Sequence, residues 1–149
     1  MPMRDRLLLA IDQFEPGQAA VDFTIGLAAK SGASVTVFHV RELSRSLRVP
    51  PLETLGDAQL LVDHTVLRMQ VAGIATEGHL CSARDEEVAK RIVEEASRRM
   101  CDAIVLGSLR LRGFHRVSGH GIRERLLQNS PLPVIVTPTS LHSGMRAVV

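Results

Sequence analysis

A loop rich in glycine and arginine, from Gly107 to about Gly119, contains the residues best suited to bind a ligand. It follows the apolar run Ala103–Leu106 and precedes a short amphipathic segment that starts near Ile122. Backbone N–H groups in such a loop, together with the first turn of a following helix, attract anions such as phosphate. The sequence therefore predicts an anion-binding loop between a strand and a helix.

Cationic side chains are concentrated in and just after this loop. Guanidinium groups can bind phosphate through paired hydrogen bonds, where bare backbone would otherwise do so. The alternative is that these side chains form a solvated loop and helix face. The cationic residues, against the single acidic residue Glu124, are Arg110, Arg112, His115, Arg116, His120, Arg123 and Arg125.

Asp12 is the second candidate binding residue, because it directly follows the apolar run Arg6–Ile11. It either contacts a ligand or caps the helix that follows, which is a common role for Asp. His39 lies inside an apolar, β-branched stretch and is expected to be a core histidine. Cys81 and Cys101 form no Cys-x-x-Cys pattern, so a disulfide or a zinc site is not expected. Both cysteines are expected to act as small hydrophobic side chains in the structure.

Apolar runs alternate with amphipathic segments along the chain, which predicts strands alternating with helices. Residues 41 to 52 are predicted to be a basic loop. The pattern predicts an α/β fold, a single-domain doubly wound five-stranded parallel sheet, for which we take the strand order 3-2-1-4-5. Strands are predicted at Arg6–Ile11, Ser34–Val40, Ile74–Ser82, Ala103–Leu106 and Pro133–Val136, and helices at a segment ending at Ser31, about Glu53–Ala72, about Asp85–Met100 and a segment ending before Ser130.

The helices have apolar faces that are expected to pack on this sheet. Ligands bind beyond the carboxyl ends of such strands where the strand order reverses, which is where Asp12 and Gly107 would meet. The inward-facing residues are predicted to be Ala20, Phe23, Thr24, Leu27 and Ala28 in the first helix, Ala58, Leu61, Val62, Thr65, Val66 and Met69 in the second, and Val88, Ile92, Val93, Ala96 and Met100 in the third.

Length and composition fit one ordinary globular domain of 149 residues, which we assign to residues 1–138 with a C-terminal tail at 139–149. The net charge of +2 gives no reason to expect nucleic acid as a partner. No apolar run approaches the roughly 20 residues of a membrane helix, so no membrane partner is expected. Because the two cysteines do not indicate a disulfide framework, a cytoplasmic location is expected. Neither a Gly-x-Ser-x-Gly nor a Walker sequence is present, so no catalytic residue is predicted.

The chain resembles the universal stress protein family over nearly its whole length. The first strand with Asp12, the pair His39-Val40 and the final strand-loop-helix-strand unit carry the resemblance. It implies a Rossmann-like, adenine nucleotide alpha hydrolase-like fold. In the family's glycine motif, Gly107 and Ser108 match the start, and Gly113 lies where members often carry glycine. The remaining positions are Arg110 and His120 in place of motif glycines, Gly121 at the Ser/Thr position, Ile122 at the hydrophobic position and Arg123 in place of the last Ser.

The resemblance implies a small regulatory protein of the stress response, with two alternatives for its mode of action. In the first it binds ATP or another adenine nucleotide, with Mg²⁺ if ATP is bound. The loop would then hold the phosphates, and the adenosine would lie against Ala10, Asp12 and Val40. In the second it is a motif-degenerate homodimer that binds no nucleotide and acts through protein partners.

Slow ATP hydrolysis is a weaker third alternative, and the resemblance implies no catalytic or metal-ligating residue. Family members commonly dimerise through the last strand, which here is Pro133 to Thr137. An apolar edge strand would be exposed in a monomer, so the resemblance implies a homodimer through this strand.

Overall fold

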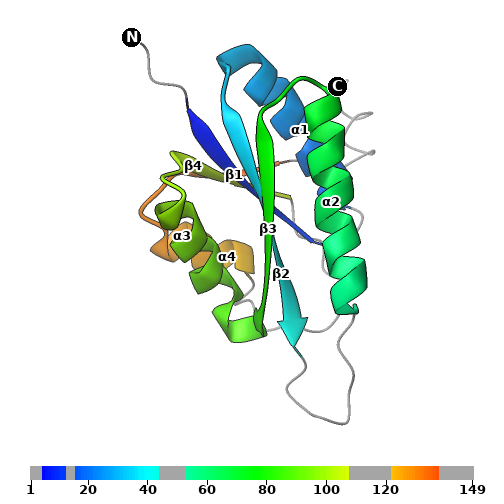
Figure 1. Cartoon of the computed structure of the whole chain (residues 1–149). Coiled ribbons are helices and arrows are strands. Elements are labelled where there is room, and N and C mark those ends of the chain that lie inside the picture. Colours follow the sequence, from blue (N-terminus) through cyan, green and yellow to red (C-terminus); the bar gives the residue numbers. More distant parts are fainter. Residues whose placement is uncertain (1–4, 13–15, 44–52, 108–121, 138–149) are drawn as a thin grey trace, which may run out of the picture.

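The computed structural model describes residues 5–12, 16–43, 53–107 and 122–137. A five-stranded parallel sheet of order β3-β2-β1-β4-β5 runs through the molecule (Figure 1). The predicted fold class and strand order are therefore confirmed. The strands are β1 (Arg6–Ile11), β2 (Ser34–Leu43), β3 (Thr76–Arg84), β4 (Ala103–Leu106) and β5 (Val134–Val136).

Helices cover both faces of the sheet (Figure 1). One face carries α1 (Pro16–Ser31) and α2 (Leu55–Val71), and the other carries α3 (Val88–Arg98) and α4 (Ile122–Asn129). A short 3₁₀ turn, η1 (Asp85–Glu87), precedes α3. Within the described residues, no helix combines the length and the apolar character that crossing a membrane requires.

The hydrophobic core has two layers, because neighbouring residues of a strand point to opposite faces of the sheet. Leu9 and Val105 pack in the layer beneath α1 and α2, whereas Leu8 and Ile104 pack in the layer beneath α3 and α4. All four side chains are fully buried. Burial on both faces explains why the central strands are continuous apolar runs rather than alternating ones.

Gly78 of β3 allows α2 to pack closely against the sheet. A Cβ atom at this position would lie 2.6 Å from Cγ1 of Val62 and 2.7 Å from Cγ2 of Val66. Real Cβ atoms do not approach carbon atoms so closely, and valine side chains are stiff at χ1. The α2–β3 spacing therefore depends on the absence of a side chain at Gly78.

Helices α2 and α3 end in the same hydrogen-bonded turn. At the end of α2, Gly73 has φ of 87° and Ile74 N–H donates to the Met69 carbonyl at 3.0 Å. At the end of α3, Met100 has φ of 56° and Cys101 N–H donates to the Ala96 carbonyl at 2.9 Å. This is the Schellman motif, whose left-handed residue is usually glycine. Met100 thus has a backbone conformation that disfavours a side chain.

Some boundaries and side-chain orientations differ from the sequence prediction. Strand β2 continues to Leu43, because it pairs with β3 up to Leu43 and Arg84, so the predicted loop begins later than residue 41. Strand β3 starts and ends later than predicted, and the first turn predicted for the third helix is 3₁₀. Phe23 is 39% and Met100 69% exposed rather than packed inward. At Met100 the backbone is left-handed, which turns its side chain away from the buried face of α3.

Candidate functional site

The carboxyl ends of β1 and β4 lie side by side at the point where the strand order reverses. Ala10 of β1 is in register with Leu106 of β4, so Asp12 and Gly107 leave the sheet at the same edge. Both residues are half-buried. We call this edge, formed by residues 10–12 and 106–107, the β1/β4 edge. The structure brings the two residues together as the sequence predicted, and the position is the usual ligand site of such sheets.

Two buried polar residues hold the backbone at the β1/β4 edge, His39 through its side chain and Thr137 chiefly through its backbone N–H. The Ile11 carbonyl accepts a hydrogen bond from Nδ1 of His39 at 2.9 Å. The Leu106 carbonyl accepts one from the backbone N–H of Thr137 at 3.0 Å, and the Thr137 hydroxyl lies 3.5 Å from the same oxygen. The residues immediately before Asp12 and Gly107 are therefore both held in place.

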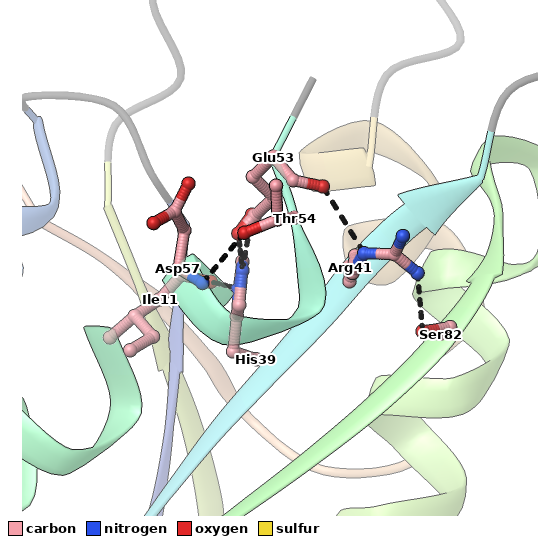
Figure 2. A network of polar contacts seen from close by, with 7 residues as sticks. All are labelled: Ile11, His39, Arg41, Glu53, Thr54, Asp57 and Ser82. Atoms are coloured by element: carbon pink, nitrogen blue, oxygen red, sulfur yellow. Dashed lines mark hydrogen bonds and ion pairs between the residues drawn. The ribbon is translucent and has the colours of Figure 1, made fainter. Parts of the chain in front are cut away.

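His39 is buried between the Ile11 carbonyl and the Glu53 carboxylate, which confirms that it is a core histidine (Figure 2). Its Nε2 lies 2.9 and 2.8 Å from the two carboxylate oxygens of Glu53. A carbonyl can only accept, so Nδ1 must carry a proton. Because Nε2 and the carboxylate oxygens are within hydrogen-bond distance of each other, one further proton must lie between them. The pair then has no net charge, which suits side chains that are only 3% and 8% exposed.

Glu53 connects this histidine to the start of α2. The Glu53 carbonyl accepts a hydrogen bond from Nε of Arg41 at 3.2 Å. The next residue, Thr54, caps the helix, because its hydroxyl oxygen accepts from the Asp57 N–H at 3.0 Å (Figure 2). A continuous set of hydrogen bonds thus links the end of β1 through His39 to the first turn of α2.

Arg41 extends the same network to β3. Its Nη1 donates to the Ser82 hydroxyl at 3.3 Å across the β2–β3 pair (Figure 2). This contact and the Glu53 contact give the guanidinium defined partners inside β2. The charged residue therefore belongs to the strand, although the sequence suggested a loop.

The other predicted site residues divide into two groups. Ala10 lies in β1 beside the edge, and Val40 lies in β2 with its side chain buried in the layer beneath α3. Both residues are paired within the sheet, and their contact with a ligand stays a prediction. Ile122 and Arg123 form the start of α4. The predicted loop residues Ser108, Arg110, Gly113, His120 and Gly121 lie outside the described residues, so their roles stay predictions.

Glu53 and Thr137 are site residues that the sequence analysis missed. The spacing of Thr54 and Asp57 is typical of a helix start and marks where α2 begins. It places Glu53 at that helix terminus but gives no link to His39, which is 14 residues away in the sequence. Thr137 directly follows β5, and its bond to Leu106 continues the β4–β5 pairing that the predicted strand order implies.

The two cysteines lie away from the β1/β4 edge and are free thiols. Cys101 is buried and Cys81 packs against the same core layer, which confirms their structural role. Burial raises the pKa of both thiols, although Arg91 opposes this shift at Cys81 and a hydrogen bond with Thr36 opposes it at Cys101. Both therefore stay protonated at neutral pH and are poor nucleophiles.

The described part of the β1/β4 edge offers a carboxylate, a glycine and a fixed backbone. Such a set can accept hydrogen bonds from hydroxyl or amino groups and can let a ligand approach the main chain closely. Within residues 5–12, 16–43, 53–107 and 122–137, no group of three or more His, Cys, Asp or Glu side chains could hold a metal ion. The arrangement suits the binding of a polar ligand.

Comparisons with known proteins agree on one family. The model of the Universal stress protein family matches residues 3–138. No curated protein sequence matches the chain at a significant level. Among solved structures, the chain is similar to a universal stress family protein from Burkholderia pseudomallei, with a TM-score of 0.70 and 23% identity over 91% of this chain and 97% of that one.

Two further similar structures contain nucleotides. A universal stress protein from Archaeoglobus fulgidus in complex with dAMP has a TM-score of 0.66 and 21% identity, over 89% of this chain and 97% of that one. A universal stress protein in complex with cAMP has a TM-score of 0.69 and 18% identity, over 91% of this chain and 98% of that one. At these identities the likeness shows the fold.

Proposed function

Because the chain belongs to the universal stress protein family, we propose that it is a small stress-response regulator that binds an adenine nucleotide at the β1/β4 edge. The observation that carries this proposal is the pair of anchored carbonyls. Ile11 is held by His39 and Leu106 by Thr137, directly before the two residues that would meet the ligand. A backbone that is already ordered loses less conformational freedom when it binds.

The chemistry of the edge suits a nucleoside with phosphate groups. The Asp12 carboxylate can accept hydrogen bonds from ribose hydroxyl groups or from the adenine amino group. The base is proposed to lie near Ala10 and Val40, whose strands end at this edge. The arginine-rich loop that follows Gly107 supplies cations for the phosphates. The relatives solved with dAMP and cAMP support adenine as the base.

Isothermal titration calorimetry with ATP, AMP, cyclic AMP and adenosine tests this proposal on protein freed of co-purified nucleotide. We expect at least one nucleotide to bind, and Asp12→Asn to weaken it at least tenfold, about 1.4 kcal/mol. Arg110→Ala is expected to weaken ATP more than the unphosphorylated nucleoside. Asp63→Asn changes an exposed carboxylate on α2 and is the matched control, with affinity within about twofold.

The same titrations separate the two modes of action. If no nucleotide binds, the proposal is wrong and the protein would act through protein partners without nucleotide. If a nucleotide binds but Asp12→Asn and Asp63→Asn behave alike, the ligand lies somewhere other than the β1/β4 edge.

We also propose that the protein forms a homodimer through β5. In the described sheet β5 pairs with β4 on one side only, and its three residues are partly exposed. Open strand edges readily pair with a second copy. Hydrogen exchange measured at low and high protein concentration tests this. Amides of Val134–Val136 that face away from β4 are expected to exchange more slowly at high concentration, and equal rates would contradict the proposal.

A further inference from the structure

A polar cavity lies between β3 and α3, on the strand at one end of the sheet. Its volume is about 210 Å³, which is below the roughly 300 Å³ at which pockets for drug-sized ligands begin. Because β2 separates β3 from β1, this β3/α3 cavity is distinct from the β1/β4 edge. The charged side chains that line it are Arg91, Glu94, Glu95 and Arg98 of α3 and Arg99 directly after the helix.

The lining of the β3/α3 cavity has one positive charge in excess, because three guanidinium groups face two carboxylates. The buried carboxylate of Glu95 serves two of the three. Its Oε2 accepts a hydrogen bond from Nε of Arg99 at 2.8 Å, and its Oε1 lies 3.4 Å from Nη1 of Arg98. Both oxygens of Glu95 are thus engaged. The Glu94 carboxylate lies 4.0 Å from Nζ of the exposed Lys90.

Arg91 carries the excess charge. It is half-buried, and within the described part of the chain it forms no ion pair with a carboxylate. Burial raises the pKa of the Cys81 thiol, and the positive charge of Arg91 opposes that shift, so the guanidinium lies close to this sulfur. Removing a charge from water costs free energy unless an opposite charge accompanies it. An anion in the cavity would supply that opposite charge.

Arg99 is held in position by two partners. Besides its bond to Glu95, its Nη2 lies 3.2 Å from Nδ1 of His79 in β3. A guanidinium can only donate, so Nδ1 accepts and the imidazole is neutral. His79 therefore orients Arg99 without adding a charge. Among the described residues, Nη1 of Arg99 has no hydrogen-bond partner, so this group can donate to a ligand.

We propose that the β3/α3 cavity is a second binding site, which takes a small oxyanion of the phosphate type through Arg91 and Arg99. Guanidinium groups bind such anions through paired charge-assisted hydrogen bonds. The volume of about 210 Å³ suits a single phosphate group rather than a whole nucleotide. Free phosphate and the phosphate group of a larger molecule offer the same chemistry, and the experiments below separate these two sources.

Titration of the ¹⁵N-labelled full chain with inorganic phosphate, followed by NMR, tests the proposal against sodium chloride of equal ionic strength. We expect saturable shifts at the amides of residues 79–81 and 91–99. Arg91→Gln is expected to weaken phosphate binding at least about fivefold. Lys30→Gln is the matched control, because it removes one positive charge from the exposed last turn of α1 on the opposite face of the sheet. Its affinity should stay within about twofold of the wild type.

Two results of this titration would refute the proposal. One is the absence of a saturable shift at residues 79–81 and 91–99, and the other is an Arg91→Gln variant that binds phosphate as the wild type does. Glu94→Gln provides a test of the opposite sign. The Glu94 side chain is 49% exposed and lines the cavity, so its carboxylate repels an anion there. This variant should bind phosphate at least about twofold more tightly, and weaker binding would contradict the charge argument.

Alkylation of Cys81 by iodoacetamide locates the anion, because the Cys81 thiol also lines the cavity. A bound anion blocks access to the sulfur and raises the pKa of the thiol further, which leaves less of the reactive thiolate. We expect phosphate to slow alkylation of Cys81 at least about threefold, measured by mass spectrometry of its peptide. Cys101 is buried outside the cavity and is the internal reference, with an unchanged rate. An unchanged rate at Cys81 would place the phosphate elsewhere and overturn the proposal.

O-phosphoserine and acetate define which anion the cavity selects. If O-phosphoserine saturates the same amides as tightly as inorganic phosphate, the site accepts a phosphate group carried by a larger molecule. If inorganic phosphate alone binds, the site takes the free ion, and both results support the proposal. If acetate binds as tightly as phosphate, the cavity attracts anions in general, and the assignment to phosphate-type oxyanions is wrong.

Discussion

The His39–Glu53 pair gives the sharpest test of how the end of β1 is held. The substitution Glu53→Ala removes the carboxylate whose two oxygens lie 2.9 and 2.8 Å from Nε2 of His39. The imidazole stays buried, and Nδ1 stays bonded to the Ile11 carbonyl. Nε2 is then left without a partner in a region that water reaches poorly.

The expected cost follows from that loss. Removing one member of a buried ion pair costs about 3–5 kcal/mol of unfolding free energy. Because the Glu53 side chain is 8% exposed, water reaches part of the site, and we expect the lower end, about 3 kcal/mol. In Glu53→Gln, an amide N–H can donate to Nε2 of a neutral His39 while Nδ1–H still donates to Ile11. We expect this variant to lose about 1 kcal/mol.

Urea unfolding followed by circular dichroism measures both values. With an m value of about 2 kcal/mol/M, the midpoint would fall by about 1.5 M for Glu53→Ala and about 0.5 M for Glu53→Gln. Asp63→Ala, at an exposed acidic residue of α2, serves as control and should stay within about 0.5 kcal/mol of the wild type. Equal losses for the Ala and Gln variants would refute the hydrogen-bond argument.

Two further predictions concern the packing of α2 and the end of α3. Gly78→Ala places a Cβ atom 2.6 and 2.7 Å from two valine methyl carbons of α2, so it should cost about 2 kcal/mol and lower the Tm by about 4–8 °C. A raised Tm would show that α2 can move away freely. Met100→Gly relieves a left-handed residue at φ of 56° whose side chain is 69% exposed, so it should stabilise by about 1 kcal/mol and raise the Tm by about 2–4 °C. Gly73→Met at the equivalent turn of α2 should have the opposite effect, and equal signs for the two substitutions would contradict the strain argument.

The sequence alone was sufficient to predict the architecture. The apolar run Arg6–Ile11 and the periodic face of α2 are local patterns, and each depends only on which neighbours along the chain are apolar. Parallel strands joined by helices then permit few arrangements, because the crossovers have one hand. The meeting of Asp12 and Gly107 at one edge follows from that topology.

The boundaries were less predictable where tertiary contacts overrode local preference. Arg41 belongs to a strand because β2 still pairs with β3 at Arg41 and Ser82, and its guanidinium also bonds to the Ser82 hydroxyl and the Glu53 carbonyl. Met100 matched the helical period, yet the Schellman turn directs it outward. In both cases the deciding partner lies on another element or beyond the helix end, so a propensity based on neighbouring residues does not contain it.

By itself, the sequence determined the sheet order, the two-layer core and the edge at which a ligand would bind, because hydrophobic periodicity and chain topology are local and geometric properties. Only the tertiary structure decided that His39 fixes the end of β1 through Glu53 and that Gly78 allows α2 to approach. Each of these depends on which side chains of distant segments meet. That is settled by packing in three dimensions and has no periodic signal along the chain.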